Sequence, residues 1–169
     1  MATPGIDIVL SNMLSEWGDI PYAELSIMLA HLKVLYELHH NHHLIARGDS
    51  FYGDHLLFQR LYEKVFEEVD QVAEKVIGLG SEENVNLSRL MNHVNKVLMS
   101  LGSSGTIPSS TSLVQKSLKA EQNFLAMVSI LALALKEKGM LTRGLDNMIA
   151  GIEDVHEGHV YLLQQRLGK

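Results

Sequence analysis

Histidine and carboxylate side chains at regular spacing are the features of this sequence that could do chemistry. Nine histidines stand among 169 residues that include no cysteine, so a metal ion would have to be held by imidazole and carboxylate groups. Five of the histidines fall within 39–55, and Asp70 and Glu74 follow, four residues apart. Fe(II) readily accepts imidazole and carboxylate ligands together, and imidazole-rich sites also suit Zn(II) and Cu(II). The residue types therefore predict a metal site and leave the identity of the metal open.

Helical periodicity predicts the elements that position these residues. Apolar residues from Phe58 to Leu79 recur in steps of three and four, which is typical of a helix with one buried face. Asp49 or Ser50 provides an N-cap and Gly80 a stop, so we expect a helix over 50–79. The same reasoning predicts three further helices, over 21–47, 112–138 and 143–166.

The connection between the second and third helices is about thirty residues long, far more than a helical hairpin needs. Apolar spacing predicts a short extra helix over 86–98, and a stretch rich in serine and glycine follows at 100–112. Ser112 and Gln115 have the spacing of a capping box for the third helix. We therefore expect an all-α fold, a ferritin-like four-helix bundle whose long crossover between helices two and three carries the extra helix. We expect it to form one domain over 1–169.

Charge and hydropathy argue against a nucleic-acid-binding arm and against membrane insertion. The formal net charge is −6, and the first basic side chain is Lys33, so the N-terminus lacks the lysine-rich arm that would bind DNA. The longest apolar run without charge, 122–135, is shorter than the roughly 20 residues of a membrane helix, and the start of the chain does not have the pattern of a signal peptide. We therefore expect a cytoplasmic protein.

The predicted helix over 50–79 holds its candidate ligands too far apart to share an ion within one chain. His55 and Asp70 are fifteen positions apart, which is about 22 Å along a straight helix. Two copies of this helix packed antiparallel, with residue i facing residue 125 − i, would bring His55 of one chain to Asp70 of the other. The predicted site then combines His43 and His55 of one chain with Asp70 and Glu74 of its twofold mate, and each dimer has two such sites.

The segment 40–80 resembles the signature of the Dps miniferritins, the DNA-binding proteins from starved cells, and the segment 153–163 resembles the last helix of that family. The resemblance implies a hollow dodecamer of four-helix subunits that stores iron. Sites at its dimer interfaces would act as ferroxidases, oxidising Fe(II) with hydrogen peroxide and suppressing oxidative stress. It also implies that iron is held by the predicted site, and we expect Zn(II) to be accepted by the same residues. The matching positions are His40 to His43, Gly48, Phe51, His55, Phe58, Tyr62, Asp70 to Lys75, Leu79 and Gly80.

Two positions depart from the pattern of the family. Many members have an acidic residue one turn after the second histidine, where this chain has Gln59, which puts binding of a second iron in question. The residue after the first histidine ligand is often tryptophan, and here it is Leu44. Tyr52 or Tyr62 is close enough in sequence to take over the role of accepting oxidising equivalents.

Two further interpretations stay open. Glu37 and His40, like Glu153 and His156, have the i, i+3 spacing with which ferritin-like proteins aim a carboxylate and an imidazole into the bundle, which predicts an intrasubunit di-metal site. The shell could also bind a non-iron metal or a partner without catalysis.

Of the remaining histidines, we expect His93 and His159 to be surface or capping residues and His31 to be a satisfied interior side chain.

Overall fold

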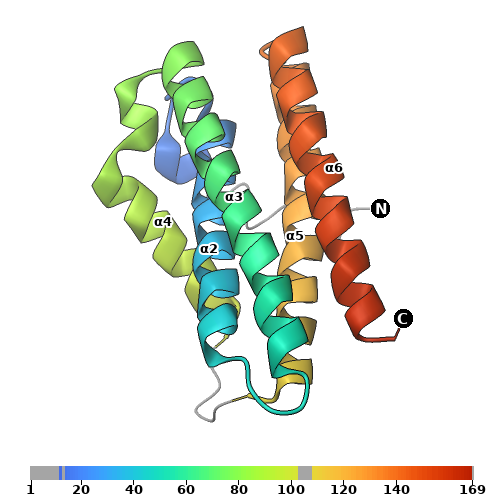
Figure 1. The fold of residues 1–169 in the computed structure, drawn as a ribbon. Coiled ribbons are helices and arrows are strands. Elements are labelled where there is room, and N and C mark those ends of the chain that lie inside the picture. Colours follow the sequence, from blue (N-terminus) through green and yellow to red (C-terminus); the bar gives the residue numbers. More distant parts are fainter. Residues whose placement is uncertain (1–11, 13, 103–107, 169) are drawn as a thin grey trace.

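A computed structural model describes residues 12, 14–102 and 108–168 of the chain (Figure 1). Helices dominate the described residues, and none of these residues lies in a strand. The elements are α2 (Ala23–Ile45), α3 (Phe51–Leu79), the short 3-10 helix η1 (Glu82–Val85), α4 (Leu87–Ser100), α5 (Ser110–Glu137) and α6 (Arg143–Arg166).

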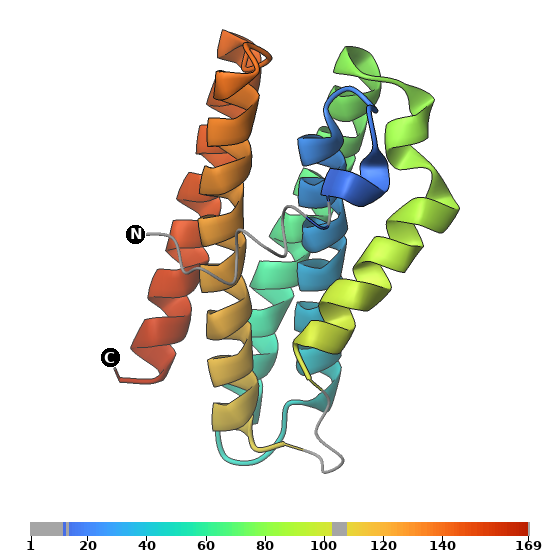
Figure 2. The same cartoon turned by 180° about the vertical axis from the view of Figure 1, so that it is seen from behind.

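The four long helices form a bundle of two antiparallel hairpins, α2 with α3 and α5 with α6 (Figure 1). The chain leaves α3 at one end of the bundle and enters α5 at the other, so η1 and α4 cross the whole length of the molecule, with α4 lying obliquely along α2 (Figure 2). The predicted ferritin-like bundle with an extra crossover helix is confirmed. Residues 103–107 of the serine- and glycine-rich stretch lie outside the described residues.

Helix α2 is the central element of the fold. It contacts α3, α4 and α5, and every residue of the stretch 23–30 is buried. A helix that is apolar on all sides needs such neighbours around it to remove its surface from water. The crossover helix α4 is therefore part of the core, because it covers the side of α2 that the other long helices leave open (Figure 2).

Helix α3 begins after Ser50 and ends before Gly80, as its capping signals predict. Its interior apolar face is formed by Phe58, Leu61 and residues 65, 72 and 76. Gly80 is required where the chain turns into η1, because a Cβ atom there would lie 2.6 Å from the Oδ1 atom of Asn84 and 3.0 Å from two backbone oxygens. The helix that carries His55, Asp70 and Glu74 is thus continuous and fixed at both ends.

Helix α5 is the one described helix that is long and apolar enough to cross a membrane. It packs against α2 and α6 inside the bundle, and its buried face includes Ser117 and Glu121. Burial against two neighbouring helices accounts for its apolar composition.

The apolar core is divided into two clusters. A large cluster fills one end of the bundle around Leu32, Phe124 and Ile152, and a small cluster around Phe58, Leu113 and Leu163 lies near the turn from α2 to α3. Along α2, α5 and α6, buried polar residues lie between the two clusters, and Glu68 of α3 contacts one of them, His156. This buried polar layer consists of His39, His42, Glu68, Ser117, Glu121, His156 and His159.

Candidate functional site

The turn between α2 and α3 brings His43 and His55 into contact. Gly48 in this turn has a φ of +86°, which glycine adopts without strain. The two imidazole rings stack with their centroids 3.6 Å apart and their planes 24° from parallel. We call these two residues the histidine pair.

Each ring of the histidine pair is held by the backbone of the other residue. The Nδ1 atom of His43 donates to the carbonyl oxygen of His55 at 2.9 Å, and the Nδ1 atom of His55 donates to the carbonyl oxygen of His43 at 3.0 Å. Because the proton of each neutral ring is then on Nδ1, the lone pair is on Nε2. Among the described residues neither Nε2 atom has a hydrogen-bond partner, so both are available to a metal ion.

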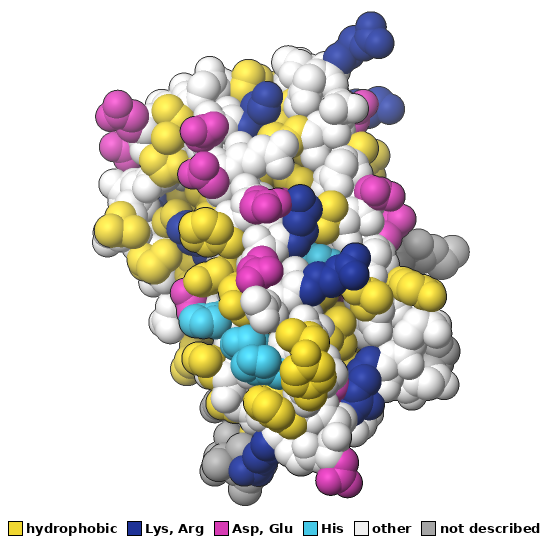
Figure 3. Space-filling model, in the orientation of Figure 1, with side chains coloured by type: hydrophobic (Ala, Val, Ile, Leu, Met, Phe, Trp, Pro, Cys, Tyr) yellow, Lys and Arg dark blue, Asp and Glu magenta, His cyan; other side chains and the backbone are white. Residues whose placement is uncertain are grey.

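Aromatic side chains surround the histidine pair at the surface. Tyr62 lies edge-on to His43 at 5.3 Å, His40 is 5.0 Å from Tyr62, and Phe51 is 5.1 Å from His55. In Figure 3, histidine side chains gather on the lower half of the face shown, beside hydrophobic side chains, and acidic side chains lie farther up the same face. Both histidines of the pair are half-buried among these rings.

The two predicted carboxylate ligands lie elsewhere on α3. Asp70 and Glu74 are exposed and lie about 22 Å or more from His55 along the helix axis. Gln59, one turn after His55, donates from its amide to the Glu63 carboxylate at 2.8 Å. One chain therefore brings His43 and His55 together and keeps Asp70 and Glu74 apart from them, and the four-residue site stays a prediction that requires a second chain.

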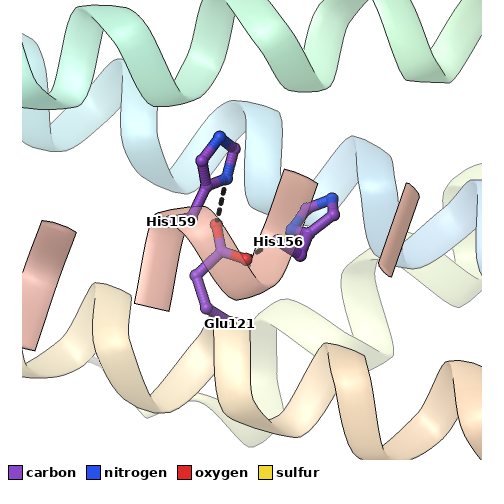
Figure 4. A group of neighbouring side chains, drawn as sticks. All are labelled: Glu121, His156 and His159. Carbon is purple, nitrogen blue, oxygen red and sulfur yellow. Dashed lines mark hydrogen bonds and ion pairs between the residues drawn. The ribbon is translucent and has the colours of Figure 1, made fainter. Parts of the chain in front are cut away.

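Inside the bundle, the Glu121 carboxylate is the acceptor for three imidazoles. The Nε2 atom of His39 lies 2.7 Å from Oε1 and the Nδ1 atom of His159 lies 3.2 Å from the same oxygen. The Nδ1 atom of His156 donates to Oε2 (Figure 4). Burial alone would raise the pKa of Glu121, but these three histidines, His156 foremost, hold it well below its usual range.

His156 lies between two carboxylates. Its Nδ1 atom faces Glu121 and its Nε2 atom lies 3.0 Å from Oε2 of Glu68. Since a carboxylate only accepts, both ring nitrogens carry protons and the ring is an imidazolium. Burial opposes this charge, but the two carboxylates outweigh it and raise the pKa of His156 to about 9. The second oxygen of Glu68, Oε1, is buried and has no hydrogen-bond partner among the described residues.

A hydrogen-bond chain runs from His42 to the same carboxylate. His39 uses its Nε2 proton for Glu121, so its Nδ1 atom accepts from the Ser117 hydroxyl at 3.1 Å, and the Nδ1 atom of His42 donates to that hydroxyl at 2.8 Å. Burial lowers the pKa of His39 and lowers that of His42 to about 3, so both rings are neutral. The chain fixes the orientation of His39 toward Glu121.

The predicted intrasubunit site built from Glu37, His40, Glu153 and His156 is wrong. Of these four residues His156 is buried, whereas Glu37 is exposed and His40 lies among aromatic rings at the surface. Glu153 is half-buried and accepts a hydrogen bond from a serine of α5 at 3.0 Å. The rotation of α2 about its axis is the reason, because it points His39 into the bundle in place of its neighbour His40.

Several buried polar residues were not predicted from the sequence. His159 and His93, predicted as surface or capping residues, are 4% and 1% exposed, whereas His31 donates to a carbonyl of its own helix as expected of a satisfied side chain. Glu68 and Glu121 are also buried, although neither was singled out from the sequence. A signal for Glu121 was present, since it falls on the apolar face of an otherwise apolar helix.

Comparison with known proteins identifies the class of fold. No protein family model matches the chain. Solved Dps structures from Listeria monocytogenes, Thermosynechococcus elongatus and Bacillus brevis superpose with TM-scores of 0.74, 0.71 and 0.72. In the same order, their sequence identities to this chain are 18%, 20% and 22%. The matches cover 87%, 87% and 85% of this chain, and they cover 92%, 89% and 92% of the solved chains. The chain is a ferritin-like bundle, and its fold is that of the Dps proteins.

One curated relative supports the resemblance at the level of sequence. A protein of Nostoc sp. described as a nutrient stress-induced DNA-binding protein is 28% identical over 104 residues, which is 62% of this chain. The matched stretch spans 54% of the length of that relative. The resemblance to the Dps miniferritins read from the sequence is thus confirmed in the fold.

Proposed function

We propose that this protein is a cytoplasmic iron-storage and detoxification protein of the Dps type, a ferroxidase that oxidises Fe(II) and keeps the ferric product inside a dodecameric shell of identical subunits. The observation that carries the proposal is the histidine pair. Two imidazoles with their Nδ1 protons fixed on backbone carbonyls present Nε2 atoms that have no hydrogen-bond partner in the part of the chain that the structure describes. Ligands oriented in this way bind a metal ion without first losing another hydrogen bond.

The proposed site is completed by a second chain. His43 and His55 of one subunit and Asp70 and Glu74 of its twofold mate hold Fe(II) as the substrate. If two α3 helices pair antiparallel in this way, the twofold axis of the dimer passes between residues 62 and 63 of each helix. Phe66, three residues away and 61% exposed, supports this pairing, because a large exposed ring near the axis is covered when two chains associate.

The ligand types fit oxidation of the bound iron. Imidazoles suit Fe(II), and carboxylates favour the harder Fe(III) once an electron has left. Hydrogen peroxide takes up two electrons when it is reduced to water, so each peroxide consumes two Fe(II) ions. The chain's own residues bind the iron and keep a coordination position open on the exposed side of the histidine pair for the oxidant. Removing iron and peroxide together suppresses formation of hydroxyl radicals.

The DNA binding recorded in the name of the Nostoc relative is not part of the proposal. The first basic side chain of this sequence is Lys33, and the net charge is −6. We therefore do not expect the acidic segment before Lys33 to neutralise DNA phosphates.

The test of the shared site is complementation between subunits. His43→Ala and Asp70→Ala are purified separately, and their Fe(II) oxidation is measured under anaerobic conditions with added peroxide. Both variants are expected to lose the rapid oxidation of the parent, and Glu67→Gln, an exposed carboxylate on the same helix, is the control that keeps it. Dissociated and reassembled as an equal mixture, the two defective chains should regain about a quarter of the parent rate. Half of the random pairings are mixed, and each mixed pair has one intact site of its two.

Two results would overturn the proposal. If the parent oxidised Fe(II) no faster than protein-free buffer, the protein would not be a ferroxidase. It would then be a shell without catalytic activity or a store for another metal. Rapid oxidation by the parent with no recovery in the mixture would show that the iron site is not shared between chains.

A further inference from the structure

We propose that the buried polar layer is a second metal site, which holds one divalent transition-metal ion on Glu121, His156 and His159 within a single chain. This inference goes beyond the proposed function, with which it shares no residue. It concerns an ion held inside the bundle, and it does not require a partner chain.

The three proposed ligands already converge. One ligand atom from each of Glu121, His156 and His159 lies within 4.8 Å of the other two, and all three residues are buried (Figure 4). They come from two adjacent helices, since α6 supplies both histidines three residues apart on one face and α5 supplies the carboxylate. An ion among them replaces the protons that the imidazoles now donate to Glu121, and the ligands need only small shifts to reach it.

A second observation, at Glu68, favours a cation in the layer. Oε1 of Glu68 is buried against the layer and lacks a hydrogen-bond partner among the described residues, while its other oxygen contacts His156. An unpartnered buried carboxylate oxygen is costly. A cation in the layer would provide a partner for this oxygen.

The residues around the three ligands form a supporting shell. His39 lies 2.7 Å from the Glu121 carboxylate and is held by Ser117, which in turn is held by His42. Hydrogen bonds of this kind orient metal-bound carboxylates and raise affinity. The fold keeps this polar layer even though it divides the apolar core into two clusters.

The donor set defines the class of ion. Two imidazoles and one carboxylate are a common set for Zn(II), and the same donors accept Fe(II) and Co(II). Three protein ligands leave a coordination position open, and His39 is the nearest further nitrogen donor.

Co(II) alone is the probe for the test, because its visible absorption reports on its ligands. The background is the double variant His43→Ala, Asp70→Ala, so that the proposed interface site cannot contribute. After one equivalent per chain is added and the protein is desalted, about one Co(II) per chain is expected to remain, with a visible spectrum of a low-coordinate nitrogen and oxygen set.

Variants of the layer separate metal binding from folding. In the same background, His159→Gln and His156→Gln are expected not to retain Co(II). His39→Gln is expected to lower the affinity for Co(II) about 10- to 100-fold, as expected of a supporting residue. His93→Gln, which changes a buried histidine on α4 outside the layer, is the matched control and keeps it. Failure of the background variant to retain Co(II), or equal retention by all the variants, would overturn the inference.

Crystals of the unaltered protein grown with Zn(II) provide a measurement that does not depend on any variant. We expect an anomalous scattering peak within bonding distance of Glu121, His156 and His159. Peaks confined to the surface would mean that the layer is a hydrogen-bonded network without a metal. Since the cobalt experiment is done without His43 and Asp70, its outcome is independent of whether the interface ferroxidase exists.

Discussion

Raising the pH from 6.5 to 9.5 should remove a stabilisation of the metal-free protein that comes from His156. The imidazolium of His156 faces Glu121 on α5 and Glu68 on α3, and the neighbouring rings of His159 and His39 complete its surroundings. Its pKa is about 9 in the folded chain and 6.5 in the unfolded one. Because the folded pKa is the higher one, the stabilisation is fully present below pH 6.5 and is lost as the pH rises toward and through 9.

The size of the loss follows from the size of the pKa shift. At roughly 1.36 kcal/mol per pKa unit, the rise to about 9 corresponds to about 3 kcal/mol of unfolding free energy. Burial lowers the pKa of His31 and His42, so both rings are neutral in the folded chain at pH 6.5 but partly protonated in the unfolded chain, and they add some stability as the pH rises. The contribution of His156 is therefore read from the difference between the parent and a variant that lacks this histidine.

Urea unfolding, followed by helical circular dichroism in the presence of a chelator, measures this loss. Protein concentration is held constant, because subunit association adds to apparent stability. Between pH 6.5 and 9.5 the parent should lose about 3 kcal/mol relative to His156→Gln, which should be the less stable protein at pH 6.5 and should gain slightly in stability as its other buried histidines lose their protons in the unfolded state. Parallel pH profiles for the parent and the variant would refute the assignment of an imidazolium between two carboxylates.

Three further substitutions test other parts of the structure. Gly80→Ala should lower the free energy of unfolding by about 1–3 kcal/mol, measured by urea unfolding, because its Cβ atom would overlap neighbouring oxygens. Gly78→Ala, whose Cβ atom would have no neighbour within 4 Å, should not lower it. Equal effects of the two substitutions would contradict the packing described for Gly80. Arg166→Gln should cost about 2 kcal/mol near pH 7 by leaving the buried Asp54 carboxylate without its partner at 2.5 Å. Burial raises the pKa of Asp54, but hydrogen bonds from Arg166 and a serine keep it below its usual value. The difference in unfolding free energy between the parent and the variant should therefore shrink as the pH falls through that pKa. A difference that stays constant with pH would argue against the ion pair. Gln59→Asp supplies a carboxylate one turn after His55. In an anaerobic titration, the number of Fe(II) ions bound per proposed site should rise toward two. An unchanged stoichiometry would show that this position does not limit iron binding.

Local signals in the sequence predicted the helices well because capping and periodicity act over a few residues. The last helix was predicted at 143–166, its observed bounds, and Thr142 caps it through its side chain. The start of α5 was placed too late, because Ser109 accepts the capping hydrogen bond that the spacing of Ser112 and Gln115 had suggested for Ser112. Two serines in one short stretch offer equivalent caps, and tertiary packing selects between them.

The candidate sites were harder to predict because they depend on how each helix is rotated about its axis. Apolar spacing on α3 favoured Tyr62 and Val69, which are half-buried, whereas the interior face contains Leu61 and Glu68. A shift of the buried face by one residue places a carboxylate in the core instead of in solvent. The apolar periodicity of the sequence does not distinguish these two rotations of the helix. The contact between His43 and His55 also depends on the geometry of the turn from α2 to α3, which spacing alone did not define.

The division of the core by the polar layer has a consequence for how the bundle opens. Residues around Phe58 and Leu163 pack with one another and share few apolar contacts with the cluster around Leu32, so the end near the α2–α3 turn is able to loosen as a cooperative unit of its own. Amide hydrogen exchange should then show two protection levels, with the change between Leu61 and Val65 on α3 and near His156 on α6. An ion seated in the layer would tie both units together and merge the two levels into one.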